Sequence, residues 1–141
     1  DQCFQHLILS FERFAPNTKQ ALNKADSQGT GTFKSTWLAR RKFPWTFNPQ
    51  SNTKTLKAMN PQIAYSPEVF TRYLAQLDRL SAMIDQAAQA DLQTMCWYYK
   101  FPPVRFNLGD MLNIFVSHDE LHIGQAERTL KVHEEQASVS M

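Results

Sequence analysis

Apolar residues recur at helical spacing in three stretches of the chain, and the first stretch covers residues 2–24. Its apolar positions fall three or four residues apart, at Cys3, Phe4, Leu7, Ile8, Phe11 and Phe14. Because this period places the side chains on one face, we predict a helix over 2–24. Pro16 leaves two alternatives open. It either kinks this helix or ends it at Ala15, with a second helix from Pro16 to Lys24, since a proline pushes the residue before it out of the helical region.

The clearest helical stripe lies in residues 66–92. Its start has the residue types that favour a helix N-terminus: Ser66 as a cap, Pro67 at the first position and Glu68 near the positive end of the helix dipole. The apolar positions that follow share one face. They are Val69, Phe70, Tyr73, Leu74, Leu77, Leu80, Ile84 and Ala88. We therefore predict a helix over 66–92.

The third predicted helix spans residues 108–134. Asn107 is a favourable cap, and Asp110 stands three residues later, where a capping-box residue would reach back to it. The preceding residues 93–106 are rich in aromatic side chains and proline, so we predict a connector that is extended in part. We expect the chain to fray from Ala137 onward.

Residues 33–65 show no sustained period. We predict a turn or two of helix over 35–41, which Phe43-Pro44-Trp45 ends, and a short helix over 53–59 before Asn60-Pro61. An irregular crossover of this length is uncommon in a small domain and is often functional. Its aromatic residues favour packing onto the rest of the protein. It either wraps one end of the core or forms a lid over a site.

Length and composition are those of one globular domain. The chain has 141 residues, 43% hydrophobic and 20% charged, so we predict a single domain over residues 1–141. The net charge of +2 is too small to indicate a nucleic-acid partner, and we interpret Arg40-Arg41-Lys42 as a solvated face. No stretch approaches the roughly 18 to 20 apolar residues of a bilayer span, so we expect no membrane partner. Cys3 and Cys96 form no metal or redox spacing, which favours a reducing cytoplasm.

Two histidines of the last predicted helix, His118 and His122, are the candidates for chemistry. They are four residues apart, which places them about 40° apart around a helix and one turn apart along it. Both imidazoles can therefore reach one ion. They share the apolar face of that helix, where unpartnered imidazoles would pay a desolvation cost. A metal ion removes this difficulty, because it takes neutral ring nitrogens as ligands.

The residues around this pair differ from the zincin motif, which has a glutamate directly after the first histidine. Here Asp119 holds that position, about 100° around the helix, and Glu120 points away from the pair, so we assign no general base. Gln125 follows His122 by three residues and lies near the same face. It is the better candidate to support a ligand or to line a pocket.

A third histidine completes the candidate site. His6 lies on the first predicted helix, and it completes a three-histidine face around an ion if that helix neighbours the last one. The alternative, in which His6 is an ordinary helix histidine, stays open at this point. His133 lies beside Glu134 and Glu135, and we interpret it as solvated surface.

The chain resembles the DinB-like superfamily, which includes the YfiT-type metal-dependent enzymes. The similarity extends over nearly the whole chain. It rests on Gln5-His6-Leu7, an arginine before Phe43-Pro44, Lys54-Thr55, Asn60-Pro61, and His118-x-x-x-His122-Ile123-Gly124-Gln125-Ala126-Glu127-Arg128. Leu121 departs from the pattern, because many members have Arg or His there, and we assign that position no role.

The resemblance implies an all-α fold, an antiparallel four-helix bundle that binds one divalent ion through three histidines. On this sequence those histidines are His6, His118 and His122. It also implies a helix before the one that contains His6. The sequence lacks that segment and shows three long helices, so we expect further residues upstream of Asp1. Members of the family are associated with hydrolase or thiol-transferase chemistry.

Three histidine ligands leave open positions for water or substrate, and zinc, nickel and iron all accept imidazole. Our hypothesis is therefore a metal-dependent hydrolase or thiol transferase that acts on a small molecule, with a homodimer left open. The alternative is a non-catalytic, metal-stabilised helical bundle for ligand binding or dimerisation. Haem binding through His6 and another histidine is a third class, and it would require a Soret band.

Overall fold

The structure, a computed structural model, describes residues 2–29, 31–49, 57–61, 67–99 and 103–139. Within these residues the protein is mostly helical, as predicted, and it also has a small two-stranded sheet. The elements in chain order are α1 (Gln2–Lys24), α2 (Trp37–Thr46), η1 (Lys57–Met59), α3 (Val69–Ala87), β1 (Met95–Tyr99), β2 (Val104–Asn107) and α4 (Leu108–Val139).

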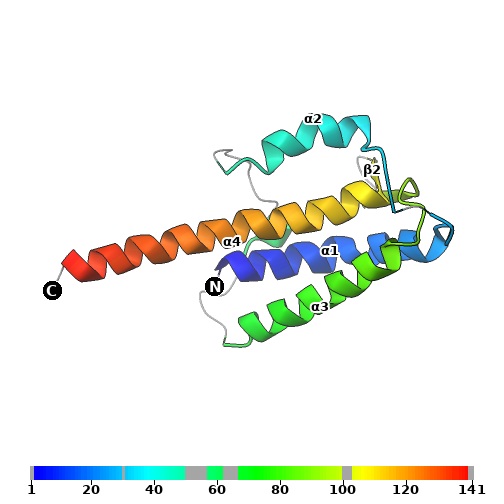
Figure 1. The fold of residues 1–141 in the computed structure, drawn as a ribbon. Helices are drawn as coiled ribbons and strands as arrows, with labels where there is room; N and C mark the ends of the chain where they lie inside the picture. Colours follow the sequence, from blue (N-terminus) through cyan, green and yellow to red (C-terminus); the bar gives the residue numbers. More distant parts are fainter. Residues whose placement is uncertain (1, 30, 50–56, 62–66, 100–102, 140–141) are drawn as a thin grey trace.

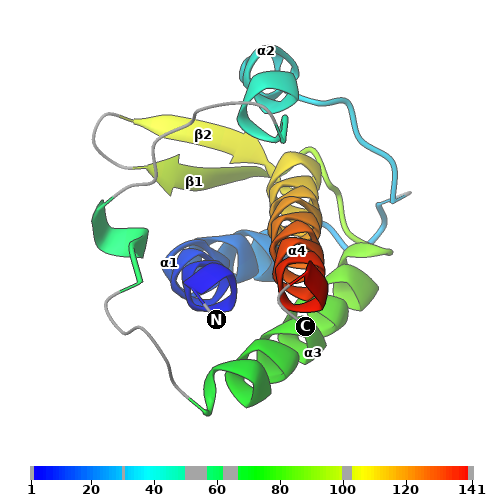
Figure 2. The ribbon, with the colours of Figure 1, turned by 90° about the vertical axis from the view of Figure 1, so that its left-hand side faces the viewer.

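Three long helices, α1, α3 and α4, pack together and form the body of the molecule. Figure 1 shows α1 between the other two, with α4 running in the opposite direction, and Figure 2 shows the three at the corners of a triangle. The core lies between them, and Phe11 of α1 and Phe115 of α4 meet there with ring centroids 5.1 Å apart. Helix α2 lies apart from this body and is attached through Phe43, whose ring centroid is 5.3 Å from that of Phe106.

Helix α1 is continuous through Pro16, which decides between the two alternatives left open by the sequence. A proline inside a helix removes one backbone hydrogen bond and clashes with the preceding turn. Here the residues on both sides of it face the same core, because Phe14 and Ala15 before Pro16 and Thr18 and Leu22 after it are all buried. Packing of both halves outweighs the local cost.

Helix α2 also continues through a proline, and here the prediction was wrong. We expected Phe43-Pro44-Trp45 to end the helix, but it extends to Thr46, and the Phe47 N–H donates to the Phe43 carbonyl over 3.0 Å. Pro44 lies in the last turn of α2. It removes one backbone hydrogen bond there, and the next bond, from the Phe47 N–H, is still made. At the other end, the Thr36 hydroxyl caps the helix by accepting from the Ala39 N–H.

Helix α3 is shorter than predicted at both ends. It begins at Val69 with Glu68 as its cap, and Ser66, the expected cap, lies outside the described residues, as do residues 53–56 of the short helix predicted over 53–59. Its end at Ala87 follows from a tertiary contact. Gly29 packs on the backbone just beyond the helix, where a Cβ atom at Gly29 would lie 1.9 Å from the Ala90 carbonyl oxygen.

The connector before α4 forms an antiparallel hairpin, which confirms the expected extended structure. Strands β1 and β2 pair Cys96 with Phe106, and both side chains are buried against the core. Asn107 caps α4 as predicted, by accepting from the Asp110 N–H over 2.8 Å. The Asp110 carboxylate does not reach back to the cap, however. It accepts from the Thr36 N–H over 2.9 Å and from the Ser35 hydroxyl, and so ties the start of α2 to α4.

Among the described residues, none of the helices combines the length and the apolar character needed to cross a membrane.

Candidate metal centre

Helices α1 and α4 bring the three predicted histidines together. The Nε2 atom of His118 lies 3.0 Å from Nε2 of His6 and 3.1 Å from Nε2 of His122. The three ligand atoms all lie within 4.8 Å of one another, and the cluster is partly shielded from solvent, with His6 buried and the other two half-buried. The one-turn spacing on α4 and the antiparallel packing of α1 therefore produce a convergent group of ring nitrogens.

The far ring nitrogens of two histidines are held by oxygen atoms. Nδ1 of His6 lies 2.9 Å from the Met59 carbonyl oxygen, and Nδ1 of His122 lies 2.8 Å from Oε1 of Gln125. A carbonyl oxygen only accepts, so each Nδ1 must carry the proton and donate it. In the neutral rings this leaves the Nε2 lone pairs of His6 and His122 directed at the centre of the cluster.

Without a metal, the three Nε2 atoms have too few protons for both short contacts between them to be hydrogen bonds. Only Nε2 of His118 is available to carry a proton, and one proton serves one of its two short contacts with Nε2 of His6 and of His122. The other contact then places two lone pairs about 3 Å apart. A cation at the centre would accept all three lone pairs at once. The donor set therefore fits a divalent transition metal, for which imidazole nitrogen is a common ligand.

The electrostatic setting favours the neutral form of His118 and His122. Burial, followed by the charges of His122 and His6, lowers the pKa of His118 to about 3. Burial and then the charge of His6 lower the pKa of His122, while its hydrogen bond to Gln125 acts in the opposite direction. At neutral pH both rings are therefore uncharged, and each has one nitrogen with a lone pair, which is the state that metal ligation requires.

Comparison with protein families agrees with the resemblance seen in the sequence. A family model described as the DinB superfamily matches residues 2–126, which include all three histidines and Gln125. The chain belongs to the DinB superfamily. Comparison with curated proteins and with solved structures gave no match.

Next to the cluster of this DinB-superfamily member lies a buried acid that the sequence gave little reason to single out. Asp119 is 8% exposed, and burial raises its pKa to about 6, although the nearby Tyr73 hydroxyl lowers it in part. Burial, and then the charge of Asp119, raise the pKa of Tyr73. Neither Oδ2 of Asp119 nor the Tyr73 hydroxyl has a hydrogen-bonding partner within the described residues. Helix angle placed Asp119 about 100° from His118, and Tyr73 of α3 lies near its carboxylate.

Most of the other residues discussed in the sequence analysis are exposed and lie outside the histidine cluster. Glu120 and His133 are exposed. Trp45, Arg40 and Arg41 are exposed on α2, which agrees with the interpretation of Arg40-Arg41-Lys42 as a solvated face. Phe47 is an aromatic residue of the crossover near the site, with its ring centroid 6.3 Å from that of His118.

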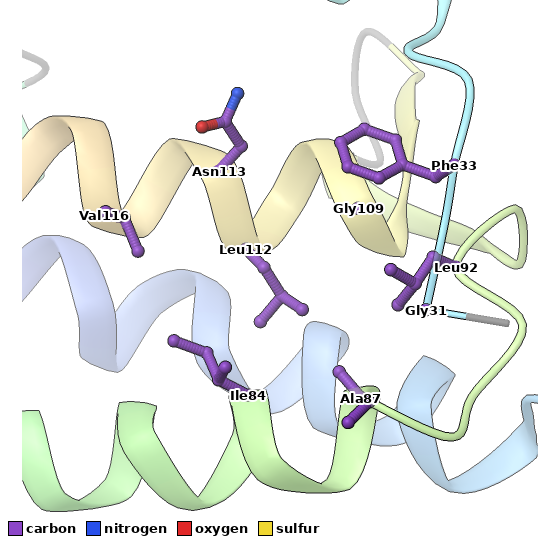
Figure 3. Close-up of a pocket in the computed structure, with 10 residues that line it drawn as sticks. Gly31, Phe33, Ile84, Ala87, Leu92, Gly109, Leu112, Asn113 and Val116 are labelled. Carbon is purple, nitrogen blue, oxygen red and sulfur yellow. The ribbon is translucent and has the colours of Figure 1, made fainter.

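A separate apolar hollow lies between α3 and the first half of α4, with a volume of about 470 Å³. Figure 3 shows Ile84 of α3, Leu112 and Val116 of α4 and Phe33 around it. Phe33 packs directly on the backbone of Gly109, where a Cβ atom would lie 2.2 Å from the Phe33 ring. None of the three histidines lines this hollow.

Proposed function

We propose that this chain binds one divalent transition metal through Nε2 of His6, His118 and His122. The observation that supports this most strongly is the convergence of the three Nε2 atoms, two of which present a lone pair because their Nδ1 atoms donate to oxygen. Zinc, nickel and iron all suit an imidazole set, and these ligands alone select none of them.

We further propose that the metal serves hydrolase or thiol-transferase chemistry on a small molecule. Three protein ligands are typical of catalytic sites, because they leave positions open for water or substrate. When bound, such an ion would lower the pKa of a water or thiol that it binds and so favour a nucleophile at neutral pH. The protein's own part is to hold the ligands: Met59 fixes the ring of His6, and Gln125 fixes that of His122.

The alternative is a metal that only stabilises the fold. It is favoured by the positions of the groups, since His6 belongs to α1, His118 to α4, and the Met59 carbonyl to η1. An ion that joins such distant segments would hold them together in the folded state without any turnover. Retained metal without activity on ester or thiol-transfer substrates would support this alternative.

The direct test is metal content by inductively coupled plasma mass spectrometry. We expect about one equivalent in the parent protein after incubation with zinc or nickel, and loss in His6→Ala and His122→Ala. His133→Ala is the matched control, because His133 lies on the same helix as His122 but is exposed and outside the cluster. Equal metal content in all four folded proteins would refute the ligand assignment.

Activity is tested separately, with the metal-loaded parent on activated esters and on thiols with small electrophiles. Turnover that disappears in His6→Ala and persists in His133→Ala would support the enzyme. Turnover that persists in His6→Ala would show that the histidines are not responsible.

We also propose that residues 1–141 form one domain. Helices α1, α3 and α4 pack together, as three helices of the four-helix bundle implied by the family would. One hydrophobic core cluster contains residues of all three. Unfolding followed by far-ultraviolet circular dichroism and by tryptophan fluorescence should then give one coincident transition.

A further inference from the structure

The outer face of α2 is aromatic and basic. Trp37 and Trp45 are 66% and 71% exposed, and Arg41 lies between them along the same face, with its guanidinium carbon 5.5 Å from the Trp37 ring centroid. Arg40 and Lys42 flank this face and are exposed. Tryptophan and arginine are the residue types most enriched at the energetic centres of protein interfaces. We call Trp37, Arg40, Arg41, Lys42 and Trp45 the α2 face.

The charge of this segment is of one sign. Residues 31–49 contain Lys34, Arg40, Arg41 and Lys42 and no aspartate or glutamate, while the whole chain has a net charge of only +2. A partner for the α2 face must therefore offer apolar surface together with negative charge.

The chain has such a surface on the second half of α4. Residues 127–138 are exposed throughout, and Figure 1 shows this part of the helix projecting beyond α1 and α3. Ile123 and Leu130 are 38% and 61% exposed and lie within about 20° of each other around the helix. Glu127 and Glu134 lie about 60° and 40° from Leu130 on the same side. We call Ile123, Glu127, Leu130 and Glu134 the α4 tail face.

The two faces match in length as well as in chemistry. Glu127 and Glu134 are separated by about 10 Å along α4, and Trp37 and Trp45 by about 12 Å along α2. An α4 tail face laid along an α2 face would place Leu130 against the tryptophans and the two glutamates beside the basic side chains. Lys131 lies about 100° from Leu130, at the edge of the tail face.

The two faces of one chain cannot meet. Helix α2 lies over the first half of α4, while the α4 tail face lies beyond the body at the other end of the same straight helix (Figure 1). A tail face that covers an α2 face must therefore come from another molecule. The family match ends at residue 126, before most of this face.

We propose that the partner is a second copy of this chain, with the α4 tail face of each copy docked on the α2 face of the other. A twofold axis makes the two contacts identical and closes the assembly. Reciprocity also doubles the buried surface, which helps a pair of helix contacts approach the roughly 1,200 Å² of a stable interface. The histidine cluster takes no part in this contact.

Charge reversal tests the proposal. Sedimentation equilibrium of the full chain from about 1 µM to about 100 µM should show a monomer–dimer equilibrium. Arg41→Glu and Glu134→Lys should each weaken dimerisation about tenfold or more, and the double variant should recover most of that loss, because the opposite charges meet again with their positions exchanged. Lys19→Glu, on an exposed part of α1, and Glu135→Lys, on another side of the tail, are matched controls that should leave the dimer unchanged.

Circular dichroism establishes that each variant is folded. Recovery of dimerisation in the double variant is a second control, because a misfolded protein would not regain the dimer. Three results would overturn the proposal. They are a monomer across the whole concentration range, a dimer indifferent to Arg41→Glu and Glu134→Lys, and a monomer whose tryptophan fluorescence shifts only with phosphatidylglycerol vesicles, which would show that the α2 face meets lipid.

Discussion

His118 is the residue that links the candidate site, because its Nε2 atom makes both short contacts in the cluster. We predict that His118→Ala abolishes metal binding while the metal-free protein remains folded. Removing this half-buried imidazole also removes its desolvation cost, which offsets part of the packing that is lost. Metal content and urea unfolding of the metal-free form provide the two measurements. A metal content equal to that of the parent would contradict the prediction.

Gln125 should influence affinity without being a ligand. Its Oε1 holds the tautomer of His122, and loss of such a supporting hydrogen bond weakens metal affinity about 10- to 100-fold. We therefore predict this decrease for Gln125→Leu, with Gln125→Glu retaining tight binding because it keeps an acceptor. Competition against a chromophoric chelator measures both. Identical affinities for the two variants would show that the hydrogen bond has no role.

In the metal-free protein, His118 and Asp119 should change the acid stability in opposite directions. The pKa of folded His118 is about 3 against 6.5 in the unfolded chain, so unfolding takes up a proton and the free energy of unfolding falls as the pH falls between these values. The pKa of Asp119 is raised from 3.8 to about 6, so the folded chain takes up that proton first and gains stability over the same range.

We therefore predict that Asp119→Asn steepens the acid-induced loss of stability between about pH 6 and about pH 4. The difference in slope should be roughly 1 kcal/mol per pH unit, because one opposing proton has been removed. Urea unfolding at a series of pH values measures it, with Glu120→Gln as an exposed control on the same helix. Parallel curves for parent and Asp119→Asn would show that Asp119 does not titrate as proposed.

At this scale the sequence indicated the candidate ligands and one of the two groups that support them. His118 and His122 follow from spacing on one helix, and Gln125 from the same angle. His6 needed the family resemblance, because spacing alone does not show that α1 lies against α4. The Met59 carbonyl had no signal at all, since every residue has a carbonyl group and only the fold brings this one to His6.

Among the elements, α2 depends on one buried carboxylate. Asp110 is fully buried and accepts from the Thr36 N–H and the Ser35 hydroxyl, just before α2 begins. Asp110→Ala leaves these donors without their acceptor, and a buried unsatisfied group costs roughly 1–3 kcal/mol. We predict that loss in unfolding free energy, together with faster amide hydrogen exchange in α2 than in α1. Unchanged exchange in α2 would show that Phe43 and Phe47 are sufficient to hold it.

The helices and their boundaries were predictable to different degrees. Periodicity identified α1, α3 and α4, because α1, α3 and the first half of α4 each bury one face. It failed at Pro44, which the last turn of α2 accommodates, and at the end of α3, where a contact distant in sequence lies at the boundary. Asp110 shows the same limit: spacing predicted a bond back to Asn107, but the actual partners lie 74 and 75 residues away.

At the scale of the whole molecule, the candidate metal makes stability depend on the metal concentration, and the proposed dimer makes it depend on the protein concentration. A metal that binds the folded chain alone raises the free energy of unfolding by about 4 kcal/mol at a free concentration a thousandfold above its dissociation constant. A dimer instead makes the midpoint of thermal unfolding rise with protein concentration. The histidine cluster and the α2 face lie on different parts of the molecule, so the two effects should separate.

We therefore predict opposite patterns in two variants. His6→Ala should lose the metal-dependent rise in thermal midpoint and keep its dependence on protein concentration, because α2 and the α4 tail face are untouched. Arg41→Glu should lose the concentration dependence and keep the rise with zinc or nickel. Scanning calorimetry at two protein concentrations, with and without metal, measures both. Loss of both effects in either variant would show that the metal centre and the dimer contact are coupled, because ordering α1, η1 and α4 around the ion would then also set the position of α2 through Phe47.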